Sequence, residues 1–487
     1  MRFLVPPCAL VLAVVLSADV RSQPGPKIQD GKAVLQLTVS SAAPPVPALR
    51  YALLPTHHDI RPGNQILAFY KCFMEQDHLF NKEAVEKQDK WYDAPLADLK
   101  GVKELEGYGG YAVAQAHRAA RMEYADWQVA ADIKQDGVMT LLPDLHKLRQ
   151  LSRILRVRAR GEIARGDFPA AVETIQTQMA LARTHNDHPT LIGMLVGVSI
   201  TAMAMASVEE FVAQPGAPNL FWALTDLPAP LFDLRKAIRG ERLFIGAELD
   251  PFIDRVNPMS EAQVGRAVTK ITELMDMIEP PKEGLAAPSW SPPKDGKVIP
   301  SPPRPARKTP ATYLGERAAD AKQVEAARAK LLPTPPTRDL RIEKFPPMQV
   351  ILIDELNRYE VARDDAVRWL CVPPWQLPVG LDKKPDSGLF TPLAPAIQKV
   401  AFVRGRIQQQ VAMLQVVEGV RVYAAANGGR LPGALAEVPL PLPLDPFTNR
   451  PFVYEPGDGV AAVRGTPPPG GTGDPMLNRV YEVRLRK

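Results

Sequence analysis

The residues of this chain that come nearest to a chemical site are histidines. All 7 lie between positions 57 and 188, and two sets are close in sequence. His185 and His188 could bind one metal ion if they lay in a single helical turn, and His57 stands next to His58. Loop-forming residues surround the first pair, and adjacent side chains seldom point toward one ion. From these spacings we predict no metal site, no catalytic residue and no cofactor site.

Acidic residues on a predicted amphipathic helix, Pro347 to Leu370, form a second candidate. The acids are Asp354, Glu355, Asp364 and Asp365, and the arginines among them are Arg358, Arg363 and Arg368. Clustered carboxylates could bind a metal ion or transfer protons. No histidine accompanies them, and arginines alternate with the acids. We therefore predict ion pairs along a solvated helix face.

A row of arginines follows one face of a predicted helix from Leu145 to Arg165. Its members are Arg149, Arg153, Arg156 and Arg160. Such a row could form a surface for anions or phospholipids. The interpretation that we favour is a solvated face, or pairing with nearby acids.

Local motifs of known chemistry are absent from the sequence. It has no Gly-x-Ser-x-Gly elbow, no His-Glu-x-x-His, no phosphate-binding Gly-x-x-x-x-Gly-Lys and no Gly-x-Gly-x-x-Gly. The 59 basic and 54 acidic residues give a net charge of +5, and the basic residues are spread along the chain. Nothing in this pattern indicates a nucleic-acid partner.

The N-terminus has the pattern of a secretory signal. Arg2 precedes an apolar stretch that ends in small residues, so we expect a signal peptide over residues 1–22 and an exported protein of the periplasm or cell envelope. Cys8 would be lost with it. The remaining cysteines, Cys72 and Cys371, could form a disulfide in an oxidising compartment, but we favour two buried free thiols.

The elements that must position any site are organised around one apolar helix, Thr190 to Val212. It has no charged residue between Asp187 and Glu209, and its apolar side chains lie on every side of the helix. Such a helix must be buried in protein or in lipid. Its many small residues, including Gly193 and Gly197, favour burial in protein, so we predict no transmembrane span beyond the signal segment.

Hydrophobic periodicity predicts a mainly α fold, a multi-helix bundle around this buried helix with a small antiparallel β module at the C-terminus. Residues 33–279 form the helical body, 280–310 a proline-rich disordered linker, 311–392 helices that pack back on the body, and 393–487 a long helix plus the sheet. Residues 33–39 are an edge strand or an extended arm. Individual helices are expected over 65–74, 112–129, 145–165, 169–183, 311–332 and 393–426.

One helical hairpin resembles a single tetratricopeptide repeat. The residues that carry the likeness are Ala159, Gly166, Asp167, Phe168, Ala171, Val172 and Ile175. Glu162 stands where the family has an aromatic residue, and Arg183 where it has a closing proline. No second copy follows, so we expect one isolated αα-hairpin and no repeat array.

Longer segments resemble uncharacterised exported proteins of planctomycete-type bacteria. They are PGAPNLFWALTDLP, FPPMQVILIDELNRYEVARDDAVRWL and LPLDPFTNRPFVY. This resemblance implies a helical fold and export, and brings no activity with it. The last part of the chain, a long helix followed by Asp445-Pro446-Phe447 and a small sheet, is similar to the globular part of type II secretion pseudopilins. The N-terminal helix and processing site of that family are missing.

Two main hypotheses follow for function. The first is a non-enzymatic exported helical scaffold or protein-interaction protein of the cell envelope, whose partner is another envelope protein or a polymer. The alternative is an exported hydrolase or processing factor with an active site assembled from distant residues. A further alternative is an accessory part of a type II secretion-like apparatus. A deep pocket with convergent carboxylates and histidines would favour the enzyme.

Overall fold

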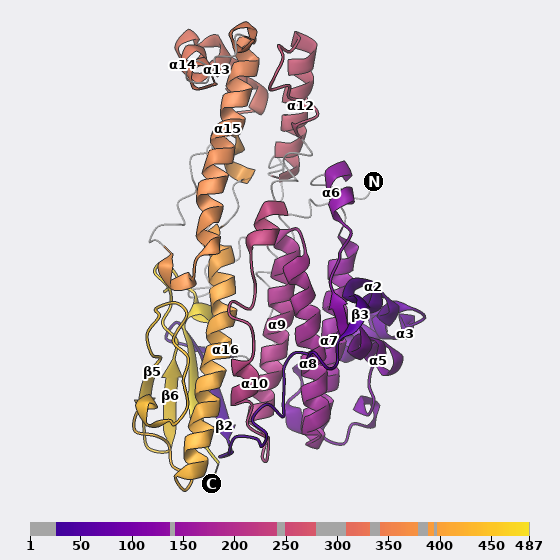
Figure 1. Ribbon diagram of the computed structural model, residues 1–487, viewed down its shortest axis with the longest axis vertical. Helices are drawn as coiled ribbons and strands as arrows, with labels where there is room; N and C mark the ends of the chain where they lie inside the picture. Colours follow the sequence, from indigo (N-terminus) through magenta and orange to yellow (C-terminus); the bar gives the residue numbers. More distant parts are fainter. Residues whose placement is uncertain are drawn as a thin grey trace, which may run out of the picture.

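The computed structural model of the protein describes residues 26–136, 142–240, 249–278, 308–331, 341–377, 388–393 and 397–486. It confirms a mainly α-helical fold with a small sheet that includes the C-terminal strands (Figure 1). The predicted signal segment, 1–22, lies outside the described residues, and so does most of the predicted linker, 280–310.

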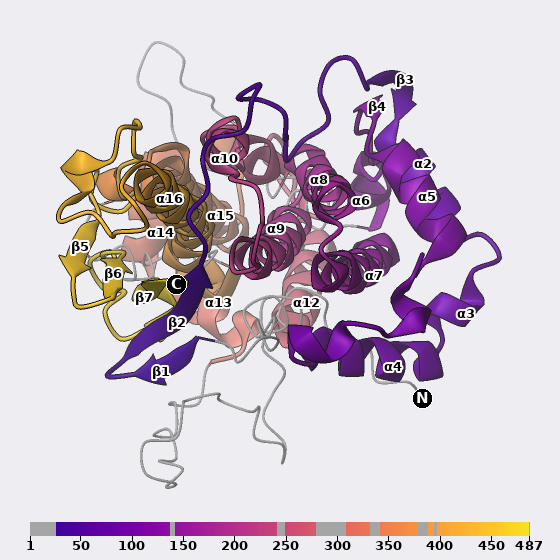
Figure 2. The ribbon, with the colours of Figure 1, turned by 90° about the horizontal axis from the view of Figure 1, so that it is seen from below.

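Four long helices form the main bundle: α7 (Pro143–Arg165), α8 (Phe168–Thr184), α9 (Leu191–Val212) and α16 (Ile397–Ala426). Figure 2 shows them end-on, with α9 between α16 and the α7–α8 pair. The predicted αα-hairpin is present, because Gly166 adopts a φ of 77° and ends α7 in a left-handed cap. These helices share one large apolar core with the sheet.

Helix α9 is the only helix of the described residues that is long and apolar enough to span a bilayer, and 78% of its most apolar window is buried inside the protein. Its glycines lie against the two candidate histidines. A Cβ on Gly193 would lie 2.1 Å from His188 Nδ1, and one on Gly197 would lie 2.6 Å from His185 Cβ. The small residues of α9 thus make room for imidazole rings.

Shorter elements cover the outer side of α7 and α8. They are β3 (Arg61–Asn64), α2 (Gln65–Tyr70), α3 (Asp77–Phe80), α4 (Lys82–Asp93), α5 (Gly110–Ala119), β4 (Met122–Tyr124) and α6 (Ala130–Asp136), while α10 (Phe221–Thr225) packs on α16. The predicted helix over 112–129 is too long. The chain leaves α5 after Ala119 because Gln65 binds the carbonyl of Met122 (2.8 Å) and β4 pairs with β3.

The sheet is mixed, and it contains an N-terminal strand. Its order is β1 (Lys27–Gln29), β2 (Lys32–Val39), β7 (Arg479–Leu485), β6 (Val460–Arg464) and β5 (Val453–Pro456). The small antiparallel module predicted at the C-terminus is present, because β5 pairs with β6 and β6 with β7, both antiparallel. The strand over 33–39 is not at the edge, however: β2 lies inside the sheet and pairs in parallel with β7. The predicted antiparallel module is therefore completed by residues from the other end of the chain.

A second apolar core lies at one end of the molecule (Figure 1). It is built by α12 (Glu261–Ile278), α13 (Pro310–Ala319), α14 (Ala321–Leu331) and α15 (Pro347–Val367). We call these helices, with the loop 249–260, the arm.

The arm bears on two expectations. The described helices of the region 311–392 pack on α12 and the loop 249–260, which belong to the predicted body, while the main core is reached by Val367 at the end of α15 and by Leu370 in the short 3-10 helix η7 (Arg368–Cys371). The predicted helix over 311–332 is two helices, separated at Asp320.

Candidate functional site

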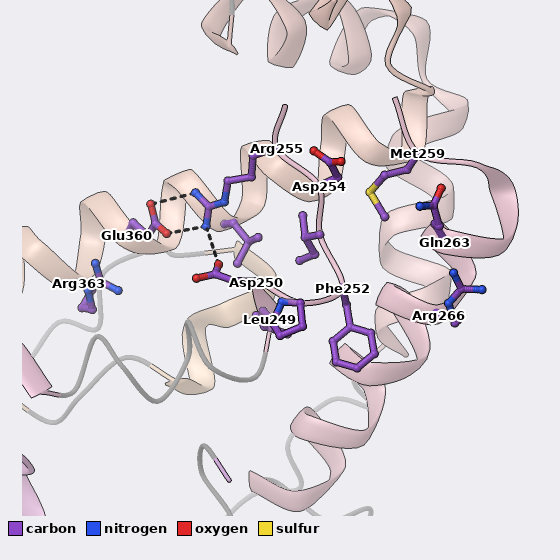
Figure 3. A pocket seen from close by; sticks show the side chains of 13 residues that line it. Leu249, Asp250, Phe252, Asp254, Arg255, Met259, Gln263, Arg266, Glu360 and Arg363 are labelled. Carbon is purple, nitrogen blue, oxygen red and sulfur yellow. Dashed lines mark hydrogen bonds and ion pairs between the residues drawn. The ribbon is translucent and has the colours of Figure 1, made fainter. Parts of the chain in front are cut away.

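A pocket lies in the arm, between the loop 249–260 and the helices α12 and α15 (Figure 3). Its volume is about 730 Å³, within the range of small-molecule and peptide pockets. The apolar side is formed by the buried side chains of Leu249, Ile253, Met259 and Leu356. The exposed mouth is polar.

The buried amide of Gln349 on α15 holds the pocket loop in place. Its Nε2 donates to the carbonyl oxygens of Asp254 and Asn257, both at 2.8 Å, and its Oε1 accepts from the backbone N–H of Met259 (2.8 Å). Gln349 is fully buried, so these bonds lie away from water. The loop is consequently fixed to α15 by main-chain contacts that do not depend on its exposed side chains.

A capping box starts α12 at the edge of the pocket. The backbone N–H of Gln263 donates to Ser260 Oγ (3.3 Å), and the backbone N–H of Ser260 donates to Gln263 Oε1 (2.7 Å). This reciprocal pair satisfies two N–H groups at the helix start. It orients the first turn, so that Gln263 and Arg266 both line the pocket.

The carboxylates of the pocket are all engaged. Arg255 Nη2 lies 2.8 Å from Glu360 Oε1 and 3.8 Å from Asp250 Oδ1. Asp254 accepts the backbone N–H groups of Val256 and Asn257, both at 2.7 Å. These bonds hold the pKa of Asp254 below its usual value. The three acids therefore act as anchors for the loop and for α15.

Two arginines of the pocket retain free donor groups. Arg266 on α12 is exposed and makes no hydrogen bond or ion pair with the described residues. Arg363 on α15 donates only its Nε, to Asp364 (3.0 Å), and stacks 5.6 Å from the ring of Tyr359. Figure 3 shows the two guanidinium groups at opposite ends of the pocket, with Arg255 between them.

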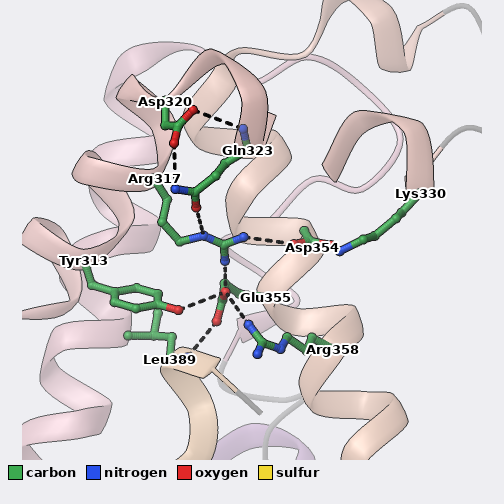
Figure 4. Close-up of polar contacts among 9 residues, drawn as sticks. All are labelled: Tyr313, Arg317, Asp320, Gln323, Lys330, Asp354, Glu355, Arg358 and Leu389. Atoms are coloured by element: carbon green, nitrogen blue, oxygen red, sulfur yellow. Dashed lines mark hydrogen bonds and ion pairs between the residues drawn. The ribbon is translucent and has the colours of Figure 1, made fainter. Parts of the chain in front are cut away.

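The acids predicted to lie on a solvated face of α15 are in part deeply buried. Glu355 is fully buried and Asp354 is 5% exposed. Glu355 accepts from Arg317, from Tyr313 Oη (3.2 Å) and from the backbone N–H of Leu389 (2.6 Å), as Figure 4 shows. Asp354 pairs with Arg317 and Lys330. Ion pairing was predicted correctly, but these two acids join helices of the arm and do not face water.

Asp364 and Asp365 do follow the prediction of local ion pairs. Asp364 pairs with Arg363, and Asp365 pairs with Arg368 at 2.9 Å, with both partners of the second pair more than half exposed. Pairs of this kind contribute little to stability.

Two arginines of the α7 row point inward, which excludes an anion or phospholipid surface there, while Arg149 and Arg153 are partly exposed. Arg156 and Arg160 are buried and pair with Glu210 of α9, and Arg160 Nε lies 2.9 Å from Glu210 Oε2. Arg160 also donates to the carbonyl oxygen of Tyr92 (2.8 Å). Arg153 pairs with Asp89. The pairing with nearby acids is confirmed, whereas the solvated face is wrong.

The candidate histidine pair is part of the core. His185 and His188 are fully buried and pack edge-on against Trp127, with ring centroids 4.9 and 4.6 Å apart from it. Burial lowers the pKa of His185 to about 4 and that of His188 to about 3. Both rings are therefore neutral at pH 7, and neither Nε2 has a hydrogen-bond partner among the described residues.

The remaining sequence candidates lie apart from the pocket. His57 and His58 are exposed in a turn, where the neighbouring Asp59 accepts from Thr56. Cys72 and Cys371 are free thiols, but Cys371 is exposed and not buried as expected. Within the described residues no group of three or more His, Cys, Asp or Glu is placed to hold a metal ion.

Glu162 explains where the hairpin departs from the tetratricopeptide pattern. It is buried and accepts from Thr174 Oγ1 (2.7 Å) and from Arg158, so a polar contact joins α7 and α8 where the family has an aromatic residue.

Comparison with known proteins adds no assignment. No protein-family model, no curated protein and no solved structure matches the chain.

Proposed function

We propose that this protein is a non-enzymatic exported helical scaffold of the cell envelope that binds another envelope protein or a polymer. The observation that carries the proposal is the pocket of the arm. It lies on the surface of a separate core at one end of the molecule, and a loop fixed by buried hydrogen bonds lines it. A preformed pocket of this kind binds with little loss of conformational entropy.

The alternative, an exported hydrolase or processing factor, has weaker support. The pocket contains three carboxylates, Asp250, Asp254 and Glu360, but no histidine lines it. All three are used in ion pairs or loop hydrogen bonds, and the pKa of Asp254 is lowered, which is unsuited to a general acid. The buried acids Glu210 and Glu355 likewise hold helices together.

An accessory role in a type II secretion-like apparatus is a second candidate. It is favoured by the succession of a long helix, α16, and the strands β5, β6 and β7, which resembles a pseudopilin module. The pairing of β2 with β7 departs from the resemblance, which was based on the last part of the chain alone.

Cross-linking in the native envelope, followed by capture of the tagged full chain and mass spectrometry, tests the scaffold proposal. We expect a partner recovered in an amount close to that of the chain. Recovery of the protein alone, together with hydrolytic activity that Glu360→Gln abolishes, would overturn the proposal in favour of the enzyme.

A further inference from the structure

The charges of the arm pocket are unequally satisfied. Its acids are each bound by a cation or by backbone N–H groups, as described above. Arg266 has no partner among the described residues, and Arg363 uses only its Nε. The charge that the pocket offers to a ligand is therefore positive, although its lining contains as many acids as arginines.

Guanidinium groups limit the kind of anion. An arginine presents paired N–H donors in one plane, which match two oxygens of a carboxylate or of a phosphate. Of these two anions, the carboxylate is the one that an unmodified protein partner carries. Arg266 and Arg363 come from different helices and lie at opposite ends of the pocket (Figure 3). A ligand that contacts both needs carboxylates at separate points along its length.

An aromatic side chain lies in the same pocket. Phe252 is 37% exposed and forms part of the lining, beside the buried apolar residues of the loop. A ligand across the pocket would cover this ring, which favours apolar groups between its carboxylates. In an extended peptide, every second side chain points to the same face. A segment in which these same-face positions are acidic and apolar in turn therefore presents both kinds of group to the pocket.

We propose that the arm pocket binds an extended acidic peptide segment of the partner protein, with carboxylates on Arg266 and Arg363 and an apolar group on Phe252. This inference rests on the scaffold function proposed above and names the chemistry of its partner.

The test is fluorescence anisotropy with the full chain and a short labelled peptide that repeats Glu-Ser-Val-Ser, at low salt, so that Glu and Val share one face of the extended peptide. A matched peptide with Gln in place of Glu measures binding without charge. Arg266→Glu should weaken binding of the acidic probe by about tenfold or more. A tenfold loss of affinity corresponds to the loss of one charge-assisted contact. Arg363→Gln should weaken it in the same direction.

Arg118→Glu is the matched control. Arg118 is exposed on α5, outside the arm, and the substitution changes the net charge by the same amount as Arg266→Glu. Its binding should equal that of the wild type. Arg266 makes no hydrogen bond or ion pair with the described residues, so Arg266→Glu should fold, and near-ultraviolet circular dichroism checks this.

Three results would overturn the inference: equal binding of the Gln peptide, binding that is insensitive to Arg266→Glu, or an equal loss in Arg118→Glu. Displacement of the probe by citrate at the same concentration as the peptide would also overturn it, and would assign the pocket to a small carboxylate. Capture of a partner without binding of the acidic probe refutes only this inference and leaves the scaffold proposal standing.

Discussion

Acidification should destabilise the protein through its two buried histidines, His185 and His188. Both are fully buried, and both pack on Trp127. Their pKa values are lowered by burial to about 4 and about 3. In the unfolded chain a histidine titrates near pH ~6.5. Between these values the unfolded state binds protons that the folded state does not, so stability falls as the pH falls below the unfolded pKa.

The size of the effect follows from these pKa values. Between about pH 7 and about pH 5, protonation of an unfolded histidine lowers its free energy by roughly 2 kcal/mol, whereas a folded histidine with a pKa near 4 or 3 gains almost nothing. The two sites together should remove about 4 kcal/mol of stability, and the loss continues until the pH reaches the folded values. Above about pH 7 their contribution to stability is complete.

Urea unfolding at several pH values measures this loss, and single variants isolate it from the titration of carboxylates. Near pH ~5 the wild type should take up about one proton per buried histidine when it unfolds. The slope of the unfolding free energy against pH is proportional to this proton uptake, so the slope in His188→Gln should be smaller by the amount that one proton contributes. An unchanged slope in His188→Gln would refute the assignment of a neutral buried ring.

Three further predictions concern packing, buried charge and thiol access. Gly193→Ala should destabilise the protein by about 1–3 kcal/mol in thermal or urea unfolding, because the new Cβ would overlap a buried imidazole. As a control, a Cβ on Gly265 would have no atom within 4 Å, so Gly265→Ala should stabilise α12 by up to about 1 kcal/mol. Arg317→Met should cost about 3–5 kcal/mol, because it leaves Glu355 buried without its main cation, and a loss below ~1 kcal/mol in urea unfolding would contradict that role. In thiol labelling of the native protein, Cys371 should react in a fast phase, and Cys371→Ser should remove this phase. A fast phase that persists in a variant that lacks both Cys371 and Cys8 would show that the buried thiol of Cys72 is accessible, contrary to the prediction.

Local patterns were sufficient to predict the helices of the main bundle. The apolar run of α9 lies where the sequence indicated, since such a run depends only on neighbouring residues. Helix α12 was missed, although its capping box, Ser260 to Gln263, is a local signal that could have identified it.

The partners of charged residues could not be predicted in the same way. The acids and arginines of α15 alternate as they would on a solvated face, yet Glu355 is buried because Arg317 reaches it from α13. Likewise Arg160 is buried because Glu210 of α9 faces it. Sequence spacing shows that a charge can be paired, but the distant helix decides whether the pair is covered.

Long-range pairing also explains the errors in the sheet and the absence of a predicted pocket. Strand β2 lies beside β7, more than 400 residues later in the chain, as in the pair Ala33 and Arg479. The pocket combines the loop 249–260 with Glu360 and Arg363 of α15, and no short motif joins these segments.

The most direct test of the central claim is site-specific photo-cross-linking of the full chain in its native envelope. A photoreactive residue at Pro251, which lines the pocket and is exposed, is compared with one at Lys82 on α4, whose side chain is 93% exposed and lies outside the arm. The scaffold account predicts one discrete cross-linked partner from position 251 and none from position 82. Absence of a product at 251, or the same products from both positions, would contradict it.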